Sequence, residues 1–200
     1  ADTKGYNGVY DGKAHPGVAS VKVTGVGGAE IAAEDMTVKY RLSDEDEWSS
    51  KMPQVTDVAD TTPVQIQVTV ANYEPITTTV QAVVTARPIT VTAETKDDFV
   101  YDGTEKSVSY SITAGTLADG QKEKVTLEGN KRTEVGGNNV IVKEVKIFAG
   151  EELDQDVTAN YDIDTVQGHI NITNNTTDLK FVEADTKGYN GVYDGKAHPG

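Results

Sequence analysis

The chain alternates hydrophobic and polar residues over short stretches, which is the period of a β-strand with one buried face. Valine and isoleucine alternate with glutamine and threonine over residues 64–70, and similar alternation appears over 89–94 and 166–172. β-Branched residues and tyrosine dominate these stretches, as pleated sheets favour. Residues 29–35 are suited to one helical turn, and no stretch sustains the stripe of a longer amphipathic helix. The pattern predicts an all-β fold.

Turn-forming residues divide the chain into two sets of short strands. The pairs Gly27-Gly28 and Gly136-Gly137 mark two of the expected turns. The first set of strands is expected near residues 18–24, 36–42, 54–58, 63–71 and 77–85. The second set is expected near residues 88–94, 107–112, 123–128, 139–148 and 160–173, the last of them broken by a turn. Short strands with regular turn signals indicate a sandwich of the Ig-like type.

A tandem repeat underlies the two sets. The tripeptide Tyr-Asp-Gly recurs at intervals of 91 and 92 residues, as Tyr10-Asp11-Gly12, Tyr101-Asp102-Gly103 and Tyr193-Asp194-Gly195. Residues 184–200 also repeat residues 1–17 letter for letter. The sequence therefore predicts a section of an array in which two diverged units form a pair and the pair then begins again.

We expect two tandem Ig-like β-sandwich domains in an elongated arrangement, followed by the first strand of a third repeat. Unit one is placed at residues 1–86 and unit two at residues 87–174. Residues 175–200 form a linker and the start of the next copy of unit one. The junction around Pro88 leaves almost no slack and predicts a rigid joint. Residues 174–178 are polar and turn-prone, and predict a softer hinge.

Unit one lacks a counterpart of the strand that opens unit two. Residues 89–93 precede the Tyr-Asp-Gly of unit two, and residues 179–183 hold the same place before the third copy. The apolar residues Leu179, Phe181 and Val182 then belong to a strand without a partner, which favours edge pairing. We hypothesise that residues 179–195 of one molecule add head to tail to unit one of another. The alternative is a tail that packs on its own unit two or has no fixed partner.

Composition and charge exclude several function classes. The chain carries 32 acidic and 18 basic residues, a net charge of −14, which argues against nucleic acid and anionic lipid as partners. It contains no cysteine, so disulfides and thiolate metal sites are excluded. No apolar run approaches the ~20 residues that a membrane helix needs.

Catalytic and metal-binding patterns are not recognisable in the chain. Ser43, Ser49 and Ser50 have no partner histidine in a nucleophile motif, and the histidines lack zinc spacing. The acidic run 44–47 has no glycine and no calcium-loop spacing. We therefore expect no catalytic residue, no cofactor and no metal. An internal isopeptide bond formed by a lysine such as Lys4 or Lys143 stays an open alternative.

Aromatic residues are the remaining candidates for a site. The tyrosine of each Tyr-Asp-Gly is expected to anchor its turn. Tyr73 and Tyr161 both follow an asparagine, and are expected to anchor a corner before the last strand. Trp48 is either a half-buried strand residue or an exposed contact for sugar or protein, and it is the one residue we would name for binding.

In order and spacing, these motifs resemble the Ig-like repeats called YDG or MBG domains, which occur in tandem in large surface proteins of Gram-positive and gut bacteria. The matching stretches are residues 10–15, 38–40, 71–73 and 86–91 in unit one, and 101–104, 117–120, 133–136, 160–163 and 168–172 in unit two. The resemblance implies an extracellular stalk or adhesin attached to the cell wall, with no catalytic residue.

Two functions follow as expectations. The first is a non-catalytic, semi-rigid stalk of a cell-surface adhesin, whose partners are the neighbouring repeats. The alternative is an adhesive module that binds a host glycan or protein through the avidity of repeated weak sites. That alternative predicts an exposed aromatic or apolar patch near Trp48, whereas a buried Trp48 favours the stalk.

Overall fold

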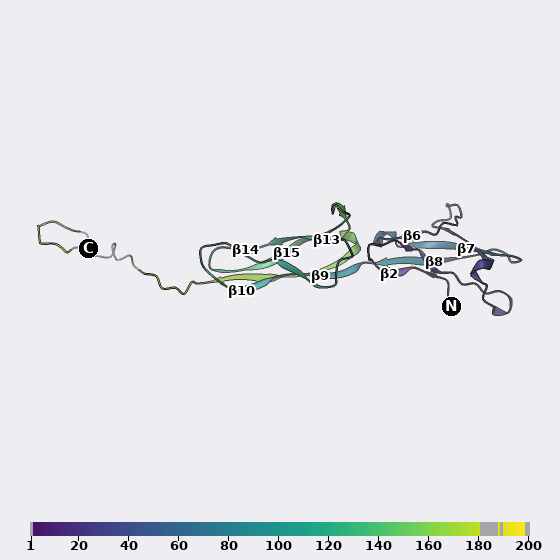
Figure 1. Ribbon diagram of the computed structural model, residues 1–200, viewed down its shortest axis with the longest axis horizontal. Coiled ribbons are helices and arrows are strands. Elements are labelled where there is room, and N and C mark those ends of the chain that lie inside the picture. Colours follow the sequence, from purple (N-terminus) through teal and green to yellow (C-terminus); the bar gives the residue numbers. More distant parts are fainter. Residues whose placement is uncertain (1, 181–187, 189, 199–200) are drawn as a thin grey trace.

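The computed structural model describes residues 2–180, 188 and 190–198, and shows two β-sandwiches placed end to end (Figure 1). The chain passes from one sandwich to the other without a break, because β8 (Ile76–Thr85) ends one residue before β9 (Arg87–Ala93) begins. None of the helices in the described residues is long or apolar enough to cross a membrane. The all-β, tandem, Ig-like and elongated fold expected from the sequence is confirmed.

Unit one is built around a four-stranded sheet in the order β2-β8-β7-β5. Its outer strand β2 (Asn7–Val9) runs parallel to the end of β8, and the other pairs are antiparallel. The remaining members of this sheet are β5 (Met36–Arg41) and β7 (Thr62–Val70). Two short antiparallel pairs face the sheet: β1 (Lys4–Gly5) with β4 (Val18–Ser20), and β3 (His15–Pro16) with β6 (Gln54–Val55).

Short 3₁₀ turns connect the strands of unit one. They are η1 (Val26–Gly28), η2 (Ala33–Asp35) and η3 (Val58–Asp60). Gly27 and Gly28 both have a positive φ, of 73° and 78°, so the turn expected at this pair is confirmed. The single helical turn expected within residues 29–35 is η2.

Unit two has two larger sheets. One has the order β12-β9-β17, in which β9 runs antiparallel to β12 (Tyr110–Ala114) and parallel to β17 (Tyr161–Val166). The other has the order β10-β18-β15-β13, with β16 (Gln155–Asp156) added to β15. Its strands are β10 (Thr95–Val100), β13 (Lys122–Glu128), β15 (Gly136–Ala149) and β18 (Gly168–Thr173). The remaining elements are β11 (Lys106–Ser107), β14 (Lys131–Arg132) and η4 (Thr158–Asn160).

Burial follows the alternation read from the sequence. Val64, Ile66 and Val68 of β7 point into the core of unit one, whereas Ile170 and Ile172 of β18 point into that of unit two. One hydrophobic cluster continues through both units, since it holds Ile66 and Val84 together with Ile89, Ile147 and Tyr161. The two sandwiches therefore share buried surface and do not meet only through the chain.

Several expectations about strands were incomplete or wrong. The strands expected near 18–24 and 54–58 are shorter, at Val18–Ser20 and Gln54–Val55, and the strand expected near 107–112 is divided between β11 and β12.

β10 was not expected, because Phe99 and Val100 are its only apolar residues, yet it pairs in parallel with β18. The pair Gly136-Gly137 was expected to be a turn but forms the first two residues of β15, directly after a bend at residues 134–135. A Cβ at Gly137 would stand 2.7 Å from the His169 ring, so the glycine here makes room for a cross-strand side chain.

The expected first strand of a third repeat lies largely outside the described residues. Residues 174–180 are exposed and form no strand. Phe181, Val182 and Glu183 are not described.

Candidate functional site

Each Tyr-Asp-Gly forms the same turn. In the first copy, Asp11 Oδ1 accepts the backbone N–H of Lys13 at 2.9 Å, and Gly12 has a φ of 78° that only glycine adopts without strain. The same hydrogen bond joins Asp102 to the N–H of Thr104 at 2.9 Å. It recurs at 3.0 Å between Asp194 and Lys196. The tripeptide is therefore a structural turn in all three copies.

In each turn, the aspartate also pairs with the side chain four residues further on, which is a histidine or a lysine. The partner of Asp11 is His15, whose Nε2 lies 2.9 Å from Oδ1. In the second copy, Lys106 Nζ takes this place beside Asp102. The hydrogen bond from His15 and the N–H of Lys13 hold the pKa of Asp11 below its usual value, so the turn favours a charged carboxylate.

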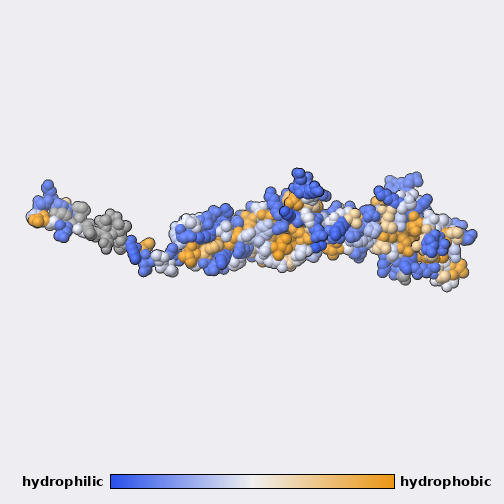
Figure 2. Space-filling view, in the orientation of Figure 1, coloured by the Kyte–Doolittle hydropathy of each residue, from blue (hydrophilic) through white to orange (hydrophobic). Residues whose placement is uncertain are grey.

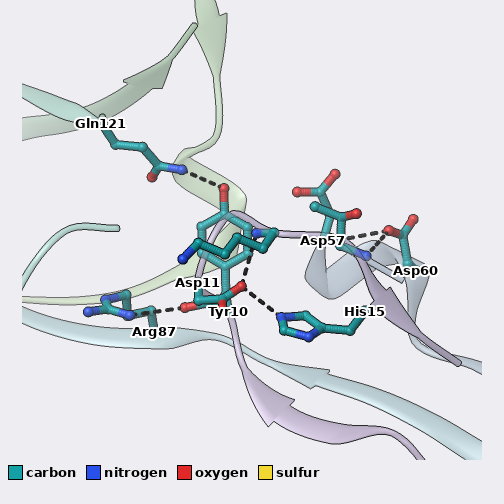
Figure 3. A network of polar contacts seen from close by, with 9 residues as sticks. Tyr10, Asp11, His15, Asp57, Asp60, Arg87 and Gln121 are labelled. Atoms are coloured by element: carbon teal, nitrogen blue, oxygen red, sulfur yellow. Dashed lines mark hydrogen bonds and ion pairs between the residues drawn. The ribbon is translucent and has the colours of Figure 1, made fainter. Parts of the chain in front are cut away.

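Tyr10, at the start of the turn in unit one, contacts residues of unit two. Its side chain is 2% exposed, and its hydroxyl accepts a hydrogen bond from Gln121 Nε2 at 2.8 Å (Figure 3). Its ring meets that of Tyr161 edge to face, with centroids 5.6 Å apart. A residue of the repeated motif thus packs on the neighbouring unit.

Tyr161 completes a relay of hydrogen bonds through Gln121. The Tyr161 hydroxyl donates to Gln121 Oε1 at 2.6 Å and accepts the N–H of Ala118 at 2.9 Å. The Gln121 amide therefore stands between two tyrosine hydroxyls, one from each unit. Burial raises the pKa of Tyr161, which keeps its hydroxyl protonated and able to donate.

Asn160 makes the second polar bridge of the joint. Its side chain is 5% exposed, accepts the N–H of Val58 at 2.8 Å and donates to Asp57 Oδ1 at 2.7 Å. Asp60 Oδ2 in turn accepts the N–H of Asp57 at 2.9 Å, and so fixes the η3 turn that presents Val58 (Figure 3).

Arg87 holds the linker itself. Its Nη1 donates to the carbonyl oxygen of Tyr10 at 3.2 Å, and its Nη2 donates to Thr116 Oγ1 at 2.8 Å. The first residue of β9 is thus bonded to both units. We call the set Tyr10, Asp57, Val58, Arg87, Gln121, Asn160 and Tyr161 the joint.

The corner tyrosine of unit one repeats half of this arrangement. Tyr73 Oη accepts the N–H of Val26 at 3.2 Å, as Tyr161 accepts that of Ala118. Tyr73 is 46% exposed, whereas Tyr161 is 7% exposed beneath Tyr10. Within the described residues, unit one covers the corner at Tyr161, whereas no other unit covers the corner at Tyr73.

Trp48 lies at the base of the hairpin that follows β5. It is half-buried, and the guanidinium carbon of Arg41 stands 4.5 Å from the centre of its ring. Arg41 is itself held by Asp44 through a 2.7 Å ion pair. One face of the indole is therefore covered by a side chain of the same hairpin.

The described residues bring together no group of three or more histidine, aspartate or glutamate side chains suited to a metal ion. In the acidic run 44–47, Asp46 bonds within its own hairpin, since it accepts the N–H of Ser43 at 2.8 Å. Lys143 pairs with the carboxylate of Glu128 at 3.0 Å, on the exposed surface.

The structure brings together only some of the candidates named from the sequence. Tyr10 and Tyr161 meet in the joint. Tyr73 and Tyr101 stand at the opposite ends of the two-unit body, and Tyr193 lies on the exposed tail with Leu179. Phe181 and Val182 are outside the described residues. Gln121 was missed, because an isolated glutamine after a glycine carries no signal of its partners.

Comparisons with known proteins add little to this geometry. No protein-family model matches the chain, and no curated protein matches it. It is similar to solved structures of the N-terminal four Ig domains of Dscam1, isoforms 6.9 and 7.44, at 11% identity. Those alignments cover 87% and 88% of this chain and 44% of each of those chains, with TM-scores of 0.27 and 0.25. The chain thus spans less than half the length of those structures.

Proposed function

We propose that the chain is a section of a non-catalytic, semi-rigid stalk, built from tandem Ig-like units in a surface protein of the YDG/MBG type. In this role the units hold a distal part of the protein away from its anchor on a cell wall. The repeat then sets the length of the stalk through its copy number, and neighbouring repeats are the main partners.

The observation that carries the proposal is the joint. Flexible domain pairs meet through small, wet contacts, whereas here a buried tyrosine and a buried asparagine cross the boundary with all their polar atoms paired. Each such hydrogen bond stabilises by roughly 1 kcal/mol, and losing one partner of a buried bond costs about 1–3 kcal/mol. Bending at the joint would break several of these bonds together, so the two units resist it.

The alternative is an adhesive module that binds a host glycan or protein weakly at many sites. Its candidate contact, Trp48, is half-buried beneath Arg41. Arg41 covers one face of the indole and leaves at most the other face for stacking on a sugar, which supports the stalk over the adhesive module.

The test is to produce arrays of one, two and three copies of the 183-residue pair and to measure their length by small-angle scattering and electron microscopy. A stalk predicts that length rises by a constant increment for each added pair. Arrays that collapse, so that length does not follow copy number, would overturn the proposal.

A glycan and host-protein binding screen of the same arrays addresses the alternative. The matched variants are Trp48→Ala and Leu42→Ala, the latter an exposed residue of the same hairpin. Binding that Trp48→Ala abolishes and Leu42→Ala retains would establish the adhesive module in place of the stalk.

A further inference from the structure

The first and the last strand segments of unit two run side by side in the same direction. β9 pairs in parallel with β17, so that residues 87–92 lie opposite residues 161–166. β10 pairs in parallel with β18, so that residues 95–100 lie opposite residues 169–173 with one shift of register. The segment that opens unit two is therefore paired with the segment that closes it, although the two pairings belong to different sheets.

The chain enters and leaves unit two at opposite ends. It enters at the joint, where β9 begins, and leaves after β18 at the end away from unit one (Figure 1). Figure 2 shows the segment after β18 standing clear of the body of unit two. Tension along the chain therefore pulls β9 and β10 towards the joint, and pulls β17 and β18 away from it. The paired strands must then slide past one another, so the evenly spaced hydrogen bonds of the parallel pairs are loaded together.

Side chains of β18 reinforce the pairing where the backbone ladder of β10 is irregular. The register shifts just before Phe99. At this interruption, Asn171 Nδ2 donates to the carbonyl oxygen of Asp97 at 3.3 Å, and the His169 ring pairs with the carboxylate of the same residue. Thr173 Oγ1 donates to the carbonyl oxygen of Phe99 at 2.9 Å. β18 therefore holds β10 through the shift as well as on both sides of it.

The paired strands also carry part of the core of unit two. Val91 of β9 and Ile170 of β18 are both 0% exposed. Such side chains keep water away from the inner side of the two pairings, and a hydrogen bond is stronger where the local dielectric constant is low. Sliding would also pull these side chains out of a close-packed interior. Apolar packing and hydrogen bonds thus oppose the same motion.

We propose that unit two bears tensile load along the chain through a clamp, formed by residues 87–92 with 161–166 and residues 95–100 with 169–173. An antiparallel pair that is pulled apart at one end opens one hydrogen bond at a time, whereas the clamp must lose several at once. Forced unfolding is governed by the unfolding rate, so this higher barrier appears as a higher unfolding force. The load-bearing role needs only the order and direction of these strands, and arrays that collapse in solution would overturn the stalk and leave it intact.

The test is single-molecule force spectroscopy of the whole chain in two pulling directions. The chain has no cysteine, so introduced cysteines give unique attachment points. Thr85→Cys with Asn174→Cys, at exposed positions just before β9 and just after β18, loads the clamp in shear. Lys122→Cys with Glu151→Cys, also exposed, pulls at the adjacent ends of the antiparallel strands β13 and β15.

The mean unfolding force should be higher in the first direction than in the second, by about twofold or more, because only the first loads the clamp in shear. Equal forces in the two directions would overturn the proposal. This comparison uses the parent strands unchanged, so it does not depend on whether a weakened clamp still folds.

A weakened clamp gives the second measurement. Asn171→Ala combined with Thr173→Val removes two side-chain bonds to β10, and should lower the force in the first direction while leaving that in the second unchanged. Lys143→Ala is the matched control, because it removes an exposed contact with Glu128 between β13 and β15. It should leave the force in the first direction at the parent value. An equal loss of force in both directions for the double variant would show general destabilisation and count against the clamp.

Discussion

At the scale of single residues, the joint depends on a few side chains with no spare partners. Gln121 offers one amide to two tyrosine hydroxyls, and Asn160 offers one amide to the η3 turn of the other unit. Among the described residues, no buried side-chain polar atom lacks a partner. Removing any one member therefore leaves a buried or part-buried polar group without its partner.

Asn160→Ala should destabilise the chain by about 1–3 kcal/mol, because the part-buried N–H of Val58 loses its acceptor and Asp57 loses a donor. Chemical denaturation measures the effect. Asn174→Ala is the control, since Asn174 is exposed beyond β18. Equal stability of the two variants would show that the Asn160 bridge contributes nothing.

Tyr10→Phe should have a smaller effect, of about 1 kcal/mol. The substitution keeps the buried ring against Tyr161 and removes only the hydroxyl that accepts from Gln121. The same denaturation experiment checks it. A loss of about 3 kcal/mol would mean that the relay, and not the ring, dominates this contact.

Because of the turn around Asp11, the free energy of unfolding should decrease as the pH falls below about 4. The folded pKa of Asp11 is depressed, chiefly by the hydrogen bond from His15, from an unfolded value of about 3.9. Its contribution is therefore fully present above about pH 4 and is lost as the pH falls through the folded pKa. Asp11→Asn keeps the acceptor oxygen without the charge.

Urea midpoints of the parent chain and of Asp11→Asn, measured from pH 3 to pH 7, test this dependence. The parent should be the more stable protein at neutral pH, and the two midpoints should converge towards the acid end. A difference that stays constant with pH would mean that the carboxylate charge plays no part.

At the scale of elements, the last strand region of unit two changes sheets at Gly168. β17 pairs with β9, and β18 pairs with β15 and β10, so the backbone must pass close to the end of β9. A Cβ on Gly168 would overlap the carbonyl oxygens of Ala93 and Glu94. The glycine therefore allows one segment to serve two sheets.

Gly168→Ala should cost about 1–3 kcal/mol through overpacking at this crossing. Thermal unfolding measures it. Gly188→Ala is the matched control, because nothing lies within 4 Å of the added methyl group there. If both variants melt with the parent, the backbone at Gly168 has room that the structure does not show.

Alternation was sufficient to predict the central strands, because β7 and β18 bury every second residue against a sheet and β8 does so over its second half, at Ala82 and Val84. It failed where burial does not set the pattern. β10 is mostly polar and is held by backbone pairing to β18, and the pair Gly136-Gly137 resembles a turn although it opens β15. The Tyr-Asp-Gly turns could be predicted, since Asp and Gly have local geometric roles. The joint could not, because Gln121 and Asn160 act on residues more than a hundred positions away.

At the scale of the whole molecule, one hydrophobic cluster runs through both units. The units should therefore unfold together, because each loses buried contacts when the other opens. Replacing both Gln121 and Asn160 by alanine removes polar contacts across the boundary and leaves the apolar core of each sandwich in place.

Calorimetry and small-angle scattering of that double variant measure the coupling. The parent should show one transition and a narrow distribution of dimensions. The double variant should show two separated transitions and a broader distribution. A double variant that still unfolds in one step would mean that the apolar cluster alone couples the units.

The literal repeat also has a consequence for inheritance. Tyr10 lies within the stretch 1–17 that returns as residues 184–200, whereas its partners Gln121 and Tyr161 lie outside it. Recombination between two such stretches in a gene would add or delete 183 codons in frame. In an addition, each new copy of Tyr10 would arrive together with its own Gln121 and Tyr161. A lineage could thus lengthen or shorten this protein in a single genetic event, without selecting a new contact.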